Sequence, residues 1–118
     1  MKIEEIQNKL AVFAEEREWD QFHSPKNISM ALAVEAGELL EIFQWMTESD
    51  SMLATSDPKL RGRIEEEIAD IQIYLLRLAD KLSVDVGSAV NRKIESNAQK
   101  YPIDRFKGSS RKYNEESE

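Results

Sequence analysis

The chain has 118 residues, of which 41% are hydrophobic and 33% charged, a balance typical of one globular domain rather than a disordered segment. Its net charge of −7 argues against a protein that binds nucleic-acid polymers, which normally carries a basic patch. The absence of cysteine excludes disulfide bonds and thiolate metal ligands. No apolar run has the length of a signal peptide or a membrane span, so we expect a soluble, cytoplasmic protein.

Apolar residues at helical spacing predict four helices, over about residues 3–17, 27–45, 58–82 and 85–100. Ser24 and Asn27 are candidate caps of the second helix, and Asp57 followed by Pro fits the start of the third. The polar segment 47–59 is predicted to be a loop. We therefore expect an all-α, four-to-five-helix bundle as a single domain over 1–108, followed by a polar, mobile tail over 109–118.

The helix predicted over 58–82 is apolar on two sides. Its main stripe contains Ile64, Ile68, Ile71, Leu75, Leu78 and Leu82, and a second stripe contains Ala69, Ile73 and Leu76. A helix that is apolar on two sides is usually buried on two sides. Because the chain is small, we expect another subunit to cover the second stripe, and hence we expect self-association.

The second helix carries a glutamate on its apolar face. Leu32, Leu39 and Ile42 form one arc at about 100° per residue. Glu35 falls inside this arc and Glu38 lies at its edge. Burial of an unpaired charge destabilises a protein by several kcal/mol. Either Glu35 has a cationic partner, or this face of the helix is not the buried one.

Two pairs of acids have the i, i+3 spacing that places both side chains on one face of a helix. Glu35 and Glu38 form the first pair, and Glu67 and Asp70 form the second on the next long helix. If the two helices are neighbours, the pairs make an oxygen-only site, which selects hard cations such as Mg²⁺ or Mn²⁺. Because Mg²⁺ is usually held by a few carboxylates plus substrate phosphates, we expect a polyphosphate ligand.

Two other interpretations of these acids remain. Glu67 belongs to a run of three glutamates, and charge runs are usually solvated faces. A di-iron bundle would need Glu-x-x-His on two helices, but no histidine follows a candidate glutamate at that spacing. The only histidine, His23, lies in a connecting segment, so the magnesium interpretation is favoured.

Aromatic and basic residues accompany the acids. Trp19, Phe22, His23 and Trp45 could line a pocket for a flat ring, because stacking contributes ~1–3 kcal/mol per base, although core packing is favoured for Phe22. Lys93 could meet a phosphate as a point charge, and Asn97 could contact a base edge. Each of these residues could equally be a core aromatic or an exposed helix residue.

Three stretches in order resemble one known family. They are FAEEREWDQFHSPKNISMALAVEAGELLEIFQW, EEIADIQIYLLRLAD, and K-x-x-x-N-x-x-x-YP at residues 93–102. Together they cover roughly residues 13–102 and resemble the MazG-like all-α nucleoside triphosphate pyrophosphohydrolases, most closely the dCTP pyrophosphatase branch. The resemblance implies a Mg²⁺-bound helical site that converts a nucleoside triphosphate to the monophosphate and pyrophosphate. It also implies dimers, or dimers of dimers, with sites near the subunit interfaces.

The resemblance assigns roles by matching motifs. It implies that the metal ligands are Glu35, Glu38, Glu67 and Asp70, that phosphate and substrate contacts are Lys93 and Asn97, and that the nucleotide pocket contains Trp19, His23, Trp45 and Tyr74. As catalytic residues we expect Glu38, which would orient or deprotonate a water, and Lys93, which would stabilise charge on phosphate oxygens.

We expect dCTP-like substrates in nucleotide-pool control or house-cleaning. A non-catalytic acidic module that binds a metal or a partner is the alternative. The sequence leaves open the base, the phosphorus attacked, the number of ions, and dimer versus tetramer.

Overall fold

The computed structural model describes residues 2–112, which contain helices and no strand, so the all-α prediction is confirmed. The α-helices are α1 (Ile3–Glu16), α2 (Pro25–Phe43), α3 (Glu48–Met52), α4 (Pro58–Lys81), α5 (Val86–Lys100) and α6 (Ile103–Phe106), and the 3₁₀ turns are η1 (Asp20–Phe22) and η2 (Ala54–Ser56). None of these helices combines the length and apolar content needed to cross a bilayer. Of the predicted mobile tail, residues 113–118 lie outside the described residues.

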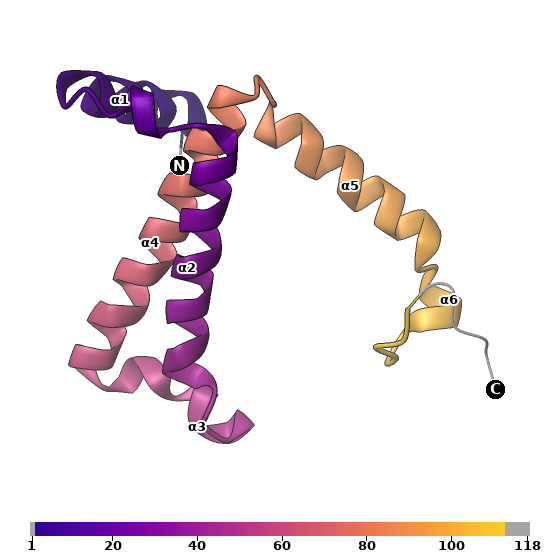
Figure 1. Ribbon diagram of the computed structural model, residues 1–118. Coiled ribbons are helices and arrows are strands. Elements are labelled where there is room, and N and C mark those ends of the chain that lie inside the picture. The colour runs from indigo at the N-terminus through magenta and orange to yellow at the C-terminus, as the bar shows by residue number, and fades with distance from the viewer. Residues whose placement is uncertain (1, 113–118) are drawn as a thin grey trace. The chain divides into compact units, whose positions relative to one another are not determined.

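The chain divides into two compact units, Met1–Val84 and Asp85–Glu118, and each is described by itself. In the first unit, α2 and α4 lie side by side and run in opposite directions, while α1 packs against α4 near the end where α2 begins (Figure 1). A hydrogen bond of 3.0 Å from Gln7 Nε2 to the carbonyl of Leu76 links α1 to α4. The single domain predicted for 1–108 stays a prediction.

Side-chain caps explain where the long helices begin. The hydroxyl of Ser24 accepts from the backbone N–H of Asn27 at 3.1 Å, and a proline follows at the first position of α2. At α4, Asp57 accepts from the N–H of Lys59 at 3.0 Å, again with a proline next. Asp85 caps α5 through the N–H of Ser88 at 2.8 Å. The sequence therefore located these three starts to within two residues.

The buried core of the first unit lies mainly between α2 and α4. One buried group consists of Ile42, Ala54 and Ile64, with Leu39, Phe43, Met46 and Leu60 packed against it. The other buried apolar residues of this unit are Ala14, Ile28, Leu76 and Ala79. Leu76 is only 2% exposed, so the expectation that another subunit covers it is wrong. Ala69 and Ile73 of the same stripe are exposed, so their cover by another subunit stays a prediction. The hydrogen bond that Gln7 donates to its carbonyl shows that α1 approaches α4 at this point.

The segment predicted to be a loop over 47–59 is partly helical, so that prediction was wrong in detail. Thr47 accepts from the N–H of Asp50 at 3.1 Å and caps α3, and the hydroxyl of Ser51 donates to the carbonyl of Glu48 at 2.6 Å. Short polar side chains can supply caps as well as turns, which makes such a segment ambiguous from sequence alone. Ala54 in η2 is buried and attaches this connection to the core.

The second unit contains α5 and α6. The short helix α6 was not predicted, because its four residues are too few to show an apolar period. Phe106 is buried at its end, and the Tyr101 ring meets it edge-on at 4.9 Å between centroids. The Arg111 guanidinium lies 5.1 Å from the same ring and donates to the carbonyl of Arg105 at 2.9 Å. One aromatic side chain therefore organises residues 101–111.

Candidate functional site

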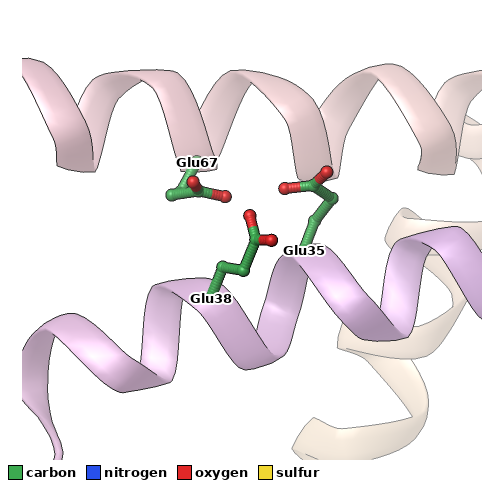
Figure 2. A group of neighbouring side chains, drawn as sticks. All are labelled: Glu35, Glu38 and Glu67. Atoms are coloured by element: carbon green, nitrogen blue, oxygen red, sulfur yellow. The ribbon is translucent and has the colours of Figure 1, made fainter.

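Three carboxylates from two helices meet between α2 and α4. Glu35 and Glu38 project from α2 toward Glu67 of α4 (Figure 2). One oxygen from each of the three side chains lies within 4.8 Å of the other two. The i, i+3 spacing on α2 presents its two carboxylates to the neighbouring helix, as the sequence predicts.

Two of these carboxylates each have a buried oxygen that no described residue satisfies. Oε2 of Glu35 and Oε2 of Glu67 are buried and accept no hydrogen bond from the described residues. The pKa of Glu35 is raised to about 7, first because its protonated form can donate a hydrogen bond to Glu67, and then because of burial and the nearby Glu38. Buried oxygens without donors destabilise a fold unless a proton or a cation joins them. The donor set is therefore suited to a hard cation.

Asp70, the fourth predicted ligand, is not among the three carboxylates that meet within 4.8 Å. It lies one turn after Glu67 on α4, is partly buried, and lines a neighbouring cavity. Its assignment as a metal ligand stays a prediction.

The cavity near α1 has a volume of about 330 Å³ and is mostly apolar. Three predicted pocket residues, Trp19, His23 and Tyr74, meet there together with Leu10, Phe13, Ala14, Asp70, Ile73 and Arg77. The Trp19 ring meets Phe13 edge-on at 5.6 Å and His23 at 6.3 Å. Aromatic walls with a few polar groups are typical of a site for a flat ligand. The cavity and the carboxylates share α4, with Asp70 on the cavity wall.

A polar network around Arg77 was missed by the sequence analysis. The Arg77 side chain is 7% exposed; it pairs with Asp20 of η1, and its Nε donates to Nδ1 of His23 at 3.3 Å. Lys81 also bonds to Asp20, at 3.2 Å. Hydrogen bonding and charge from Lys81, and then the charge of Arg77, lower the pKa of Asp20. An arginine inside the apolar run LLRLA was the available sequence signal.

The remaining predicted site residues occupy exposed positions. Trp45 follows the end of α2 and is 90% exposed, and it is not part of the cavity lining. Lys93 and Asn97 lie one turn apart on α5 in the second unit, where both are exposed. The proposed contacts of these three residues with a nucleotide stay predictions.

Comparison with known proteins gives consistent matches. The sequence model of the MazG-like family matches residues 30–115. Two relatives named dCTP pyrophosphatase 1 are 42% identical to the chain, over 111 residues in Rattus norvegicus and 113 in Homo sapiens. These alignments cover 94% and 96% of this chain but only 65% and 66% of the relatives. A crystal structure of a pyrophosphatase from Archaeoglobus fulgidus matches with a TM-score of 0.78 and 42% identity, covering 86% of this chain and 94% of that one.

Proposed function

The chain belongs to the MazG-like family, and on this basis we propose that it hydrolyses nucleoside triphosphates to the nucleoside monophosphate and pyrophosphate. Family membership confirms the resemblance found in the sequence. The observation that carries the proposal is the group of three carboxylates, Glu35, Glu38 and Glu67, beside an aromatic cavity. Two of their buried oxygens have no donor among the described residues. The names of the relatives favour dCTP-like substrates, and hence a role in nucleotide-pool control or house-cleaning.

Mg²⁺ is the proposed cofactor, with Mn²⁺ as a possible substitute. Glu35, Glu38 and Glu67 would hold it, because they offer only oxygen atoms and two of these are buried without a donor. Asp70 is proposed as a further ligand by its place one turn after Glu67. When bound, such a metal polarises phosphoryl oxygens and lowers the pKa of a bound water.

Other steps would be carried out by protein side chains, which would accept a proton, stabilise charge and bind the base. Glu38 is the most exposed of the three carboxylates that meet, so it is the one that can accept a proton from a solvent-derived water. Lys93 would stabilise negative charge on phosphate oxygens. Trp19, Tyr74 and Trp45 would hold the base by stacking, while His23 and Asn97 would contact its polar edge.

A release assay tests the activity. Pyrophosphate should appear from dCTP, dTTP, dATP and dGTP with Mg²⁺, fastest from dCTP, and should stop when EDTA removes the metal. The alternative is a non-catalytic acidic module, which would bind Mg²⁺ or Mn²⁺ but release no pyrophosphate from any of the four. Release that continues unchanged in EDTA would contradict the metal site and leave the hydrolase proposal without its carrying observation.

We also propose that the chain forms a dimer or a dimer of dimers. Met30 and Val34 lie one turn apart on α2 and are 53% and 60% exposed, with Ala33 and Gly37 on the same face. A small-residue and apolar face of this kind is unusual on an isolated monomer. Light scattering over a dilution series should give at least twice the mass of one chain at micromolar protein. A stable, active monomer would contradict this.

A further inference from the structure

Arg77 is a buried charge in the wall of the aromatic cavity. Its side chain is 7% exposed, and it connects α4 to η1 and to the residue after η1. One guanidinium nitrogen pairs with Asp20, and Nε donates to Nδ1 of His23. The planar guanidinium offers its donors in a fixed geometry, so both partners are oriented at once.

The direction of the bond to His23 determines the state of that ring. Arginine is always protonated and has no acceptor, so Nδ1 of His23 must be the acceptor. Burial, and next the positive charge of Arg77, lower the pKa of His23, which favours the neutral ring. A neutral imidazole that accepts at Nδ1 carries its proton on Nε2. Arg77 therefore selects the Nε2-protonated tautomer.

This tautomer matters because His23 lines the cavity. Trp19 and Tyr74 supply stacking faces in the same lining, and stacking alone discriminates little between bases. A fixed N–H donor favours a ligand edge with an acceptor, such as a ring carbonyl or an unprotonated ring nitrogen. An edge that offers only a donor would leave two N–H groups facing each other, which is unfavourable in a small apolar cavity.

We propose that Arg77 is a positioning residue that holds His23 as an Nε2–H donor toward an acceptor on the edge of the nucleobase. The proposal has two halves. The ligand half, that His23 meets a nucleobase, rests on the function proposed above. The structural half, that Arg77 selects the tautomer of His23, does not depend on that function. Asp20 extends the network and keeps Arg77 directed at η1, while Lys81 bonds to Asp20.

The first test needs no ligand and no activity. His23 is the only histidine in the chain, so its ring nitrogens give an unambiguous pattern in a long-range ¹H–¹⁵N NMR correlation. The wild-type protein at neutral pH should show the Nε2-protonated tautomer. A ring protonated at Nδ1, or averaged between the two tautomers, would overturn the proposal whatever the enzyme hydrolyses.

The second test links the tautomer to base choice. Arg77→Lys keeps the charge for Asp20 but loses the fixed geometry, so it should remain folded while the His23 ring becomes averaged. The ratio of kcat/KM between the best and worst dNTP should fall by about tenfold, as in His23→Ala, with kcat for the best substrate retained. Lys81→Met is the matched control, because Lys81 contacts Asp20 and not His23, and it should keep both tautomer and ratio.

The outcomes separate the two proposals. A wild-type protein that has the expected tautomer but hydrolyses no dNTP contradicts the proposed function and leaves the structural half standing. A folded Arg77→Lys protein with unchanged base discrimination overturns the link between Arg77 and specificity. If Arg77→Lys fails to fold, a wild-type ring that is protonated at Nδ1 or averaged between tautomers still overturns the proposal.

Discussion

Two polar clusters lie on the same helix and are built in opposite ways. Around Glu67, carboxylates of α2 and α4 meet, and two of their buried oxygens have no donor among the described residues. Around Arg77, ten residues or about 15 Å further along α4, a buried cation has its partners in Asp20 and His23. The described residues leave polar atoms of the first cluster without partners, whereas in the second cluster the buried charge is paired by the protein itself.

This difference indicates what each cluster is for. A group of like charges destabilises the fold that contains it, and a bound cation reverses this penalty. Paired charges instead fix the geometry of the elements that carry them, here η1 and α4. We therefore interpret the carboxylates as a site suited to a cation and the Arg77 network as the scaffold that positions His23 beside it.

The largest expected effect is on activity at the carboxylates. Glu35→Gln and Glu67→Gln should each lower kcat/KM by about 100-fold or more, because a metal ligand is lost. Both metal-free variants should unfold at a higher urea concentration than wild type. Glu66→Gln, one residue away on an exposed position, is the control and should change neither quantity. Wild-type turnover in Glu35→Gln at saturating Mg²⁺ would refute the site.

The Arg77 cluster should respond in the opposite sense. Arg77→Met should lower the free energy of unfolding by about 2 kcal/mol, since a buried group loses charge-assisted hydrogen bonds. The matched control is Arg61→Met, which removes a 2.9 Å pair with Glu65 whose side chains are 59% and 63% exposed. That loss should be under about 1 kcal/mol. Equal urea midpoints for the two variants would remove the contrast between the clusters.

Trp45 tests whether binding extends beyond both clusters. Trp45→Ala should leave the free energy of unfolding within about 0.5 kcal/mol, because the side chain is 90% exposed. It should raise KM for all four dNTPs alike, by about tenfold if the ring stacks on the base. Steady-state kinetics with each dNTP provide the measurement. If the order of the bases changed instead, Trp45 would contribute to discrimination and not only to affinity.

The smallest expected effect is a pH dependence of the stability of the metal-free protein, which distinguishes the carboxylates from the Arg77 cluster. The folded-state pKa of Glu35, about 7, is higher than its ordinary value of 4.5. Between these values the folded protein retains a proton that the unfolded chain loses, so metal-free stability should fall as pH rises from 4.5 to 7. Partial solvent exposure of Glu35 keeps this change small. Urea midpoints in EDTA should show the fall in wild type and not in Glu35→Gln, and Mg²⁺ should suppress it.

Local patterns in the sequence were sufficient for the helices and for part of the site. Caps such as Ser24 and Asp57 act within one turn, so the sequence locates helix starts without knowing the fold. Glu35 stood out because a carboxylate on an apolar arc needs a partner, and the structure places it beside Glu67. The resemblance to a family, carried by the order of its motifs, predicted Trp19, His23 and Tyr74 as pocket residues, and these three line one cavity.

Tertiary packing decided what no local pattern contains. Leu76 was expected to face another subunit, but it is buried within the chain, at the point where Gln7 of α1 bonds to its carbonyl. In the sequence, Arg77 is one of several charges on a long helix. In the structure, Asp20 and His23, more than fifty positions away, are its partners. Helical periodicity tells which residues share a face, because that depends only on neighbours along the helix. Which element covers that face depends on contacts distant in sequence, and these determine both the buried arginine and the state of His23.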